Sequence, residues 1–303
     1  MSNRHIPPVV LETKYDNLQL VGRGKVRDIY DLGESLLLVA TDRISAFDVI
    51  IPDGIPGKGY VLTQLSAFWF SELWKYNDMI PHHLLSTEVE SFPSACHPHI
   101  DSLRGRTMLA HKTKPLPVEC IVRGYISGSA WKEYRTQGTV CGQRFPRELQ
   151  ESEQFPEPIF TPSTKSMDGH DENISYTDME RLIGHDLAAQ VQAASLTIYT
   201  HATKIALTHG IVIADTKFEF GIDPKTEQLM LIDEVLTPDS SRFWPKDKVL
   251  PGKSPPSLDK QFVRDYLDMT GWDHSPPAPN LPPKVIQQTS EKYLEILSRL
   301  TDC

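Results

Sequence analysis

The segment IVIADTKFEFG, residues 211–221, constrains the fold more than any other part of the chain. Its apolar start and the alternation that follows predict a β-strand. Because successive side chains of a strand point to opposite faces, Asp215, Lys217 and Glu219 share one face, with neighbours about 6–7 Å apart. Three charges on one face, directly after an apolar run, indicate either a solvated sheet face with a local ion pair or a functional site.

The next apolar segment adds further carboxylates. MLIDEV ends in Asp233 and Glu234 after the turn-rich IDPKTEQ, which predicts a hairpin with the first strand. A carboxylate pair from these strands would suit Mg²⁺, which takes oxygen ligands and shares them with substrate phosphates. Lys217 would balance the charge or contact an anion. Sequence does not set the hairpin register, so Asp233 and Glu234 both stay candidates to face the lysine.

Two segments that contain arginine predict anion pockets. The Ser-Ser-Arg turn that ends at Arg242 offers hydroxyls and a guanidinium suited to a phosphate or carboxylate. In LPVECIVRGYISGSAWKEY, Arg123 ends a strand, and we expect a helix to start near Ala130. Ser129 would then lie at a helix N-terminus, where N–H groups attract anions; a plain N-cap is the alternative. Asp171 lies in GHDENIS, which suits a substrate-side loop or a merely solvated one.

The motif GRGKVRD, residues 22–28, predicts a glycine turn. It is not a Walker A loop, because Val26 follows the lysine where Ser or Thr is needed. It is not a dinucleotide fingerprint, because Arg27 occupies the third glycine position and no helix follows. What remains is a hairpin turn between two strands, in which backbone N–H groups and Lys25 would meet the phosphates of a nucleotide. A plain tight turn is the alternative.

The rest of the pattern predicts a two-lobed chain that mixes helices and strands. A length of 303 residues favours about two domains, and a boundary near Lys114 gives lobes 1–114 and 115–303. The stretch 142–175 is rich in Pro, Gly, Ser and acidic residues and predicts one long loop. The other expected strands are 18–22, 26–31, 35–40, 107–112 and 117–125, and the expected helices are 61–76, 177–183, 185–209, 258–268 and 284–300.

Composition narrows the classes of function. Lys and Arg number 31 against 40 Asp and Glu, a formal charge of −9, which argues against a protein that reads nucleic-acid backbones. Four scattered cysteines without a CxxC pair predict reduced thiols rather than a zinc knuckle. No segment approaches about eighteen consecutive apolar residues. The first residues carry charge and proline where a signal peptide has an apolar core, so we expect a cytoplasmic protein.

Six segments occur in a recognisable order between about residues 18 and 300. They are GRGKVRDIY, ATDRISAFDVI, LPVECIVRGYISGSAWKEY, FPEPIFTPSTKSMDGHDENIS, IADTKFEFGID and IDEVLTPDSSRFW. In this order they resemble the SAICAR synthetase family, the phosphoribosylaminoimidazole-succinocarboxamide synthases, and the chain is most similar to the stand-alone eukaryotic form. LPVECIVRGYISGS and IADTKFEFG match the two signature stretches of the family without a departure.

The resemblance implies a fold and a reaction. The fold is a two-lobed α+β fold related to ATP-grasp enzymes, with an antiparallel N-terminal sheet and a larger α+β C-terminal lobe. The reaction joins the carboxylate of carboxyaminoimidazole ribotide (CAIR) to the amine of L-aspartate through an acyl phosphate, and ATP becomes ADP and phosphate. Mg²⁺ is the implied metal. The implied partners are these small molecules, without nucleic acid or membrane, and we expect a monomer.

Matched motif by motif, the resemblance also implies roles for single residues. Glu219 and Asp233 would hold the Mg²⁺ beside the nucleotide, which selects Asp233 over Glu234. The other implied contacts are ATP with Arg23, Gly24 and Lys25; the ribotide phosphate with Arg123, Ser129 and Arg242; the CAIR carboxylate and its own metal with Asp171, Asp215 and Lys217; and further substrate contacts with Asp42, Arg43 and Ser45.

Two other classes of protein share parts of this pattern. A kinase-like phosphotransferase also has a glycine hairpin over ATP, but the sequence contains neither H-R-D-x₄-N nor D-F-G. A non-catalytic nucleotide-binding regulator would keep GRGK without needing the carboxylate set or Arg242.

Overall fold

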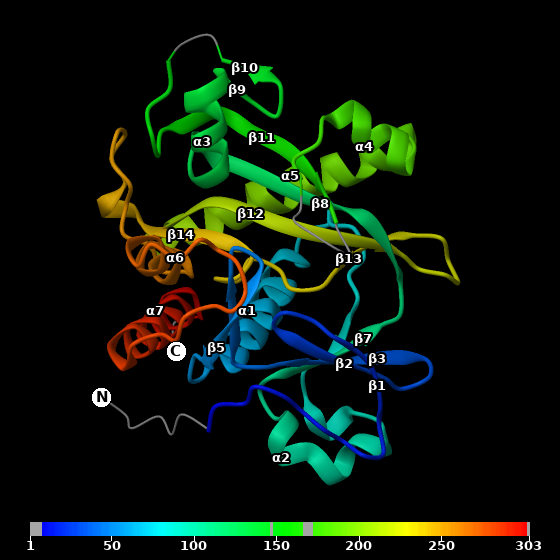
Figure 1. The fold of residues 1–303 in the computed structure, drawn as a ribbon. Coiled ribbons are helices and arrows are strands. Elements are labelled where there is room, and N and C mark those ends of the chain that lie inside the picture. The colour runs from blue at the N-terminus through cyan, green and yellow to red at the C-terminus, as the bar shows by residue number, and fades with distance from the viewer. Residues whose placement is uncertain (1–7, 146–147, 166–171, 302–303) are drawn as a thin grey trace. The chain divides into compact units, whose positions relative to one another are not determined.

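The computed structural model describes residues 8–145, 148–165 and 172–301. It confirms the predicted α+β class, since every ladder between strands in that part of the chain is antiparallel and helices pack beside the sheets (Figure 1). None of the helices within these ranges is long and apolar enough to cross a lipid bilayer.

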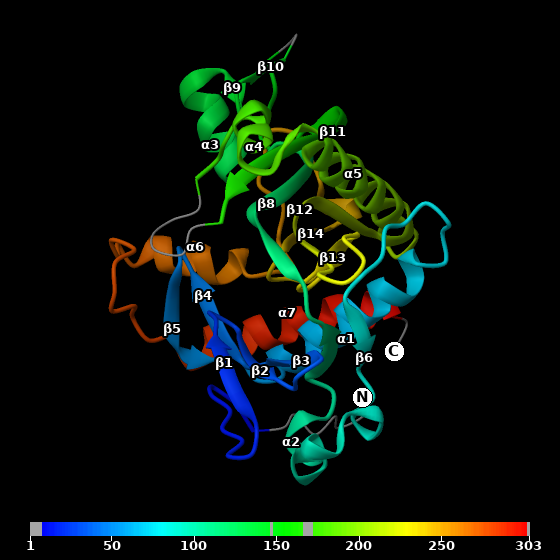
Figure 2. The same cartoon turned by 90° about the vertical axis from the view of Figure 1, so that its right-hand side faces the viewer.

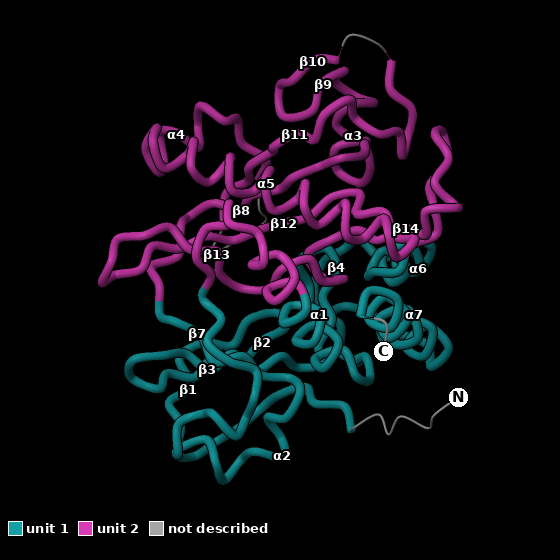
Figure 3. The backbone as a smooth tube through the Cα atoms, turned by 180° about the vertical axis from the view of Figure 1, so that it is seen from behind, with its two compact units in different colours: residues 1–68, 83–112, 258–303 teal, residues 69–82, 113–257 magenta. Residues whose placement is uncertain are grey.

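Packing divides the chain into two compact units (Figure 3). Unit 1 comprises residues 1–68, 83–112 and 258–303, and unit 2 comprises residues 69–82 and 113–257. The change of unit at 112–113 lies close to the predicted boundary, but residues 258–303 group with the first part of the chain. Apolar contacts between segments distant in sequence cause this grouping, and a single linear boundary cannot express it. The lobes 1–114 and 115–303, as functional divisions, stay a prediction.

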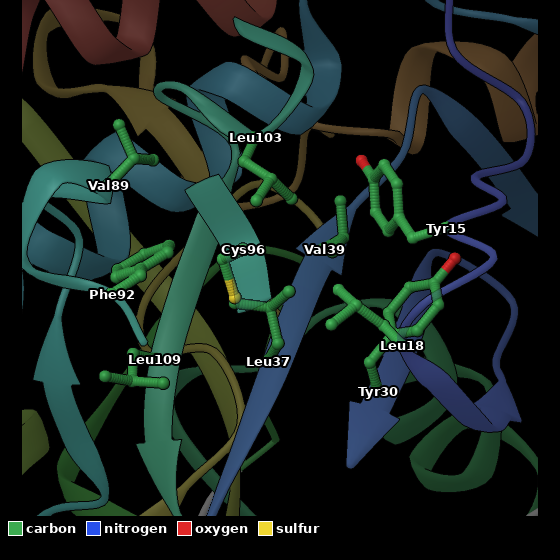
Figure 4. Packing of buried hydrophobic residues seen from close by; sticks show 10 residues of the cluster. All are labelled: Tyr15, Leu18, Tyr30, Leu37, Val39, Val89, Phe92, Cys96, Leu103 and Leu109. Carbon is green, nitrogen blue, oxygen red and sulfur yellow. The ribbon is translucent and has the colours of Figure 1, made fainter. Parts of the chain in front are cut away.

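Unit 1 contains a five-stranded sheet in the order β1-β2-β3-β7-β6. Its strands are β1 (Gln19–Arg23), β2 (Arg27–Asp31), β3 (Ser35–Ala40), β6 (Leu84–Ser86) and β7 (Thr107–His111). The predicted strands at the start of the chain are therefore confirmed. The segments η1 (Val89–Ser91), η2 (Ser94–His99) and α2 (Ile100–Leu103) supply core residues to the same cluster. Figure 4 shows that cluster: Tyr15, Leu18, Tyr30, Leu37, Val39, Val89, Phe92, Cys96, Leu103 and Leu109.

A second core of unit 1 joins segments more than 200 residues apart in sequence. Its elements are the hairpin β4 (Arg43–Ala46) and β5 (Val49–Gly54), with α6 (Gln261–Met269) and α7 (Pro283–Thr301). The hairpin was not predicted, whereas both helices were. The ring of Phe47, in the hairpin turn, stacks on His274 with centroids 3.7 Å apart. Part of the proline-rich stretch 251–283, to which the sequence assigned no role, therefore packs on this hairpin.

Helix α1 (Lys58–Leu73) confirms the helix predicted at 61–76, although it begins and ends three residues earlier. The aromatic and aliphatic stripe that predicted it is mainly core, because Leu62, Leu65, Trp69 and Leu73 are all buried.

Unit 2 contains the larger mixed region. Its main sheet has the order β11-β8-β12-β13, and β14 also pairs with β12. The strands are β8 (Lys114–Tyr125), β11 (Gln154–Thr164), β12 (Ile211–Ile222), β13 (Leu229–Ile232) and β14 (Ser241–Pro245), with a small hairpin of β9 (Thr139–Val140) and β10 (Gln143–Arg144). The helices are α3 (Gly128–Gln137), α4 (Tyr176–Ile183), α5 (His185–Thr208) and the short η3 (Lys246–Lys248).

The predicted loop 142–175 is wrong over its central part, where β11 pairs with β8 at the six residues from Ile159 to Thr164 and at Gln154. Prolines at 156, 158 and 162 argued against a strand. They are tolerated because β11 is the edge strand of its sheet, so a missing N–H need not break a ladder on both sides. The Ser-Ser-Arg turn is also corrected, since Ser241 and Arg242 begin strand β14.

Helix α5 covers the apolar face of the unit 2 sheet (Figure 2). Phe218, Phe220 and Cys120 on that face are buried. The buried Tyr199 of α5 donates a hydrogen bond from its hydroxyl to the carbonyl of Ile213, at 2.6 Å. Gly124 makes this approach possible, because a Cβ atom there would lie 2.1 Å from the Tyr199 hydroxyl oxygen. The charged residues of β12 therefore occupy the opposite face.

Candidate active site

The strand register of unit 2 gathers the predicted charged residues on one sheet face. Asp215 of β12 lies opposite Arg123 of β8 and opposite Arg242 of β14. Lys217 and Glu219 follow Asp215 on the same face, each two positions further along β12. Glu219 lies opposite Glu119 of β8 in the strand register. Since side chains alternate along a strand, this register confirms that the three β12 charges share one face.

An arginine cluster forms around Asp215. Its Oδ2 atom accepts hydrogen bonds from Arg242 at 2.5 Å, from Ser127 at 3.3 Å and from Arg123 at 3.4 Å. A second guanidinium nitrogen of Arg123 lies 3.4 Å from the Ser129 hydroxyl. Two guanidinium groups lie at this one carboxylate, and planar guanidinium donors of this kind are suited to bind phosphate or carboxylate groups. Burial lowers the pKa of Arg123, while Asp215 opposes the shift.

The loop before α3 explains how this cluster forms. Ser127 is the N-cap and Ser129 the second residue of α3, so Ser129 is not the cap that one interpretation of the sequence expected. Gly128 has a positive φ of 54°, and a Cβ atom there would lie 2.2 Å from a guanidinium nitrogen of Arg242. Glycine therefore lets the start of α3 and Arg242 approach closely.

A lysine cluster forms further along the same face. The Lys217 ammonium binds Glu119, and it lies 2.8 Å from Glu219 Oε1, while Lys165 of the chain after β11 binds Glu219 Oε2. Burial works to lower the pKa of Lys217, but the carboxylates of Glu219, Glu119 and Asp233 raise it above its ordinary value. Burial works to raise the pKa of Glu219, but Lys217 and Lys165 lower it. Each charge in the cluster is stabilised by its opposites.

The carboxylates that the resemblance assigns to a metal differ in what they contact. Glu234 is buried and accepts a hydrogen bond from Thr237. Asp233 has a positive φ of 63°, and its carboxylate helps to raise the pKa of Lys217. Asp215 is already bound by two arginines. Within the described ranges no group of three or more His, Cys, Asp or Glu side chains is arranged to hold a metal ion. Two carboxylates, Glu219 and Asp233, fit Mg²⁺ if phosphate oxygens and water complete its shell, which is its usual mode of binding.

The glycine turn lies in unit 1, between β1 and β2. The N–H of Gly24 donates to the Arg27 carbonyl at 2.8 Å, which closes the predicted hairpin turn. Lys25 is half exposed and forms an ion pair with Asp48. The Arg23 side chain is turned towards Glu12 and Asp28, at 3.1 and 3.2 Å. Of the three residues assigned to ATP, Lys25 is therefore the one whose side chain projects from the turn as predicted.

The residues Asp42, Arg43 and Ser45 are buried in unit 1. Asp42 accepts hydrogen bonds from the N–H groups of Val10 and Gly59 at 2.8 Å, and it forms an ion pair with Arg106 at 3.3 Å. Both carboxylate oxygens of Asp42 are thus used by the chain itself. Contact of these three residues with a substrate stays a prediction.

Asp171 lies outside the described residues. The sequence did not single out Glu119 or Lys165, which the structure adds to the lysine cluster. A signal for Glu119 exists, because it lies four residues before Arg123 in one strand and therefore on the same face. A cavity of about 500 Å³ lies in unit 2 beside α3, and none of its lining residues was predicted as a site residue: Glu133, Gln137, Cys141, Gly142, Asn173, Ile174 and Ser175.

Comparison with known proteins identifies relatives over nearly the whole chain. The family model described as SAICAR synthetase matches residues 20–279. The phosphoribosylaminoimidazole-succinocarboxamide synthase of Syntrophotalea carbinolica is 57% identical over 295 residues, 97% of this chain and 98% of the relative. The protein of the same name from Geotalea uraniireducens is 58% identical over 294 residues, 97% of this chain and 98% of the relative.

Solved structures agree with these relatives. The SAICAR synthase of Saccharomyces cerevisiae, complexed with SAICAR, has a TM-score of 0.85 and 46% identity, and the match covers 98% of each chain. A type-2 SAICAR synthetase in complex with ADP has a TM-score of 0.67 and 25% identity, and the match covers 93% of this chain and 97% of that one. The resemblance to the SAICAR synthetase family is thus confirmed. The yeast protein matches the whole chain at 46% identity, and the bacterial relatives match the same length at higher identity.

Proposed function

This chain belongs to the SAICAR synthetase family, and on that premise we propose that it joins the carboxylate of CAIR to the amine of L-aspartate at the expense of ATP. The proposal rests mainly on two relatives that are named phosphoribosylaminoimidazole-succinocarboxamide synthase. They match this chain over nearly its whole length at 57 and 58% identity. The unit 2 sheet adds independent support, because its charged face offers cations and carboxylates that suit anionic reactants.

The chemistry explains why such a face is useful. A carboxylate resists attack by an amine because its oxygen is a poor leaving group. Transfer of the γ-phosphoryl group of ATP to a carboxylate oxygen gives an acyl phosphate and ADP. The aspartate amine then forms the C–N bond, the C–O bond to phosphate breaks, and the amine loses a proton. Three anionic reactants must be held together, so positioning and charge stabilisation supply the rate.

Each cluster has a proposed role in that scheme. Arg123, Ser129 and Arg242 bind the ribotide phosphate, a role that their guanidinium and hydroxyl donors, gathered around Asp215, support. Asp215 holds the two guanidinium groups in place beside the CAIR carboxylate, and Asp171 acts near the same carboxylate and its metal. Lys217 stays protonated, because its pKa is raised, and offers a cation to the reacting carboxyl group.

The nucleotide is assigned to two sets of residues. The glycine turn and Lys25 contact the phosphates of ATP. Glu219 and Asp233 would hold Mg²⁺, which neutralises phosphate charge when bound. A metal at Glu219 would replace the ammonium groups of Lys165 and Lys217, which occupy both of its oxygens. Lys165 would then be free to approach the phosphates, and Lys217 the reacting carboxyl group.

The remaining assignments concern the setting of the enzyme. We place it in the cytoplasm as a monomer that acts on small molecules, without a nucleic-acid or membrane partner. The negative net charge supports the absence of a nucleic-acid partner. Light scattering would support a monomer at 34.2 kDa, and twice that mass would contradict it.

The reaction is tested by the release of ADP. We expect release only when CAIR and L-aspartate are both present, together with one amide product per ADP. Steady turnover with CAIR alone would contradict the ligase, and turnover with a protein substrate would favour a kinase-like phosphotransferase.

The metal assignment is tested by Glu219→Gln. We expect the Mg²⁺ concentration for half-maximal activity to rise about tenfold or more and ATP to bind more weakly, because one anionic ligand is lost. Glu157→Gln is the control, since Glu157 is exposed on β11. Normal activity of Glu219→Gln at low Mg²⁺ would show that another residue holds the metal.

A further inference from the structure

The carbonyl groups of the glycine turn are held by one buried arginine. A terminal nitrogen of Arg43 donates to the Gly24 carbonyl at 2.9 Å, and its Nε lies 3.4 Å from the Lys25 carbonyl. Its other terminal nitrogen donates to the Leu11 carbonyl. The Arg43 side chain is only 7% exposed. Its donors are therefore spent on the chain itself, and a direct contact with substrate is not needed to explain this residue.

The guanidinium group of Arg43 is held in turn by an ion pair with Asp28 of β2. The Asp28 carboxylate is fully buried and lies 2.8 Å from a terminal nitrogen of Arg43. It also accepts hydrogen bonds from the N–H and the hydroxyl of Thr13, at 2.7 and 2.8 Å. With these partners neither the carboxylate nor the guanidinium can turn without breaking several hydrogen bonds.

The same hairpin reaches the turn a second time. Arg43 begins β4, and Asp48 lies in the turn between β4 and β5, where its φ is 63°. Asp48 forms the ion pair with the Lys25 side chain. The β4–β5 hairpin thus contacts the glycine turn at two places: Arg43 binds the carbonyl groups of the turn, and Asp48 binds the Lys25 side chain.

A phosphate needs the N–H side of a turn and is repelled by its carbonyl oxygens. A cation bound to those oxygens fixes the peptide planes and offsets their negative partial charge. We propose that Arg43 is a positioning residue for the nucleotide: it holds the carbonyl groups of Gly24 and Lys25 inwards, so that the turn presents N–H groups and Lys25 to the ATP phosphates. This proposal rests on the proposed function of the turn.

The decisive variant is Arg43→Lys. A lysine keeps a positive charge for Asp28 but lacks the planar fork that reaches two carbonyl groups. We expect the Kd for ATP, measured by calorimetry, to rise about tenfold, as loss of a charge-assisted hydrogen bond predicts. The KM for ATP should rise with it, while the KM values for CAIR and L-aspartate stay at the wild-type level. Hydrogen exchange of the amides at residues 22–27 should become faster in the ligand-free protein.

The matched control is Val89→Ala, which removes buried contacts from the core of unit 1 without touching the turn. It should lower the melting temperature and leave ATP affinity and exchange at 22–27 unchanged. If Arg43→Lys does not fold, Asp28→Asn/Arg43→Gln removes both buried charges together and serves in its place. Its ATP affinity should fall and its exchange at 22–27 should rise in the same way.

The outcomes separate the two proposals. Wild-type protein that bound no ATP would contradict the proposed function. Wild-type binding with an Arg43→Lys affinity within about twofold of wild type would overturn only the role of Arg43. An equal loss of ATP affinity in Val89→Ala would also overturn it, because general destabilisation would then explain the effect.

Discussion

Glu219 is the residue on which the charge balance of the lysine cluster depends. Lys217 binds one of its carboxylate oxygens and Lys165 the other. A metal ion that approaches Glu219 must therefore compete with two ammonium groups. Lys165 is the weaker competitor, because its side chain is 38% exposed and water screens the ion pair.

Removal of Lys165 should consequently strengthen metal binding. For Lys165→Met we expect the Kd for Mn²⁺ in the presence of ADP to fall by about two- to fivefold, since an ion pair this exposed is worth at most about 1 kcal/mol. Electron paramagnetic resonance of free Mn²⁺ measures it. Lys253→Met, at an exposed lysine outside the cluster, is the control. Weaker metal binding in Lys165→Met would show that this lysine assists the metal.

Asp28 should make the free energy of unfolding depend on pH below about pH 4. Burial works to raise its pKa, but Thr13 and Arg43 lower it below the ordinary value of 3.8. A carboxylate with a lowered folded pKa contributes stability that is complete above its unfolded pKa and is lost as the pH falls through the folded pKa. Asp28→Asn should therefore cost about 3 kcal/mol at pH 7.

Urea unfolding at several pH values measures this difference between wild type and Asp28→Asn. We expect a constant difference from pH 7 down to about pH 4, and a decrease only below that. Asp101→Asn, at an exposed position of α2, should show no such trend. A difference that shrinks already between pH 7 and pH 5 would mean that another group causes it.

Much of the site at residue level could be predicted from strand alternation and motif matching. Asp215, Lys217 and Glu219 share a face because the side-chain period of a strand is two residues. The partners across the sheet could not be predicted, since Glu119 meets Lys217 through a register that sequence does not specify. Nor could sequence tell that Arg43 is buried, because a charged residue after an apolar strand suits a site and a core network equally.

At the scale of elements, α5 packs so closely on the unit 2 sheet that the position of Gly124 has no space for a larger side chain. Gly124 of β8 should tolerate no side chain, because a Cβ atom would lie 2.1 Å from the Tyr199 hydroxyl oxygen and 3.0 Å from its Cζ. For Gly124→Ala we expect a loss of about 1–3 kcal/mol from overpacking.

A double-mutant cycle assigns that loss to Tyr199. Tyr199→Phe alone loses the hydrogen bond to Ile213 and should cost about 1 kcal/mol. The double variant Gly124→Ala/Tyr199→Phe should lose clearly less than the sum, because the hydroxyl is the nearest obstacle. Additive losses in thermal unfolding would show that the strain arises elsewhere.

Elements with a strong period were predicted well, and elements with conflicting signals were not. The helices α4, α5 and α7 follow the predicted ranges closely. Strand β11 was missed because its prolines suit an edge strand, and edge position is a property of the sheet rather than of the segment. The hairpin β4–β5 was missed because Phe47 and Asp48 adopt positive φ without the Asn-Gly signal of a tight turn.

At the scale of the whole molecule, helix α6 and the hairpin that carries Arg43 share one core. Leu267→Ala, at a fully buried position of α6, should cost about 2–5 kcal/mol. Because the hairpin would lose support, ATP affinity should also fall. Met269→Ala is the control on the same helix, since Met269 is 79% exposed. Thermal unfolding and ATP titration measure the two effects. A destabilised Leu267→Ala variant with wild-type ATP affinity would contradict this coupling.

The assembly of unit 1 from three separate segments has a consequence for protein synthesis. The ribosome makes residues 113–257 of unit 2 before it makes residues 258–303, although the latter complete the core around Ile44, Ile51 and Ile55. The apolar side of the β4–β5 hairpin therefore has no partner helices to pack against while more than 200 further codons are translated. During that interval it is a natural target for chaperones, and a pause in translation before residue 258 should expose it to aggregation.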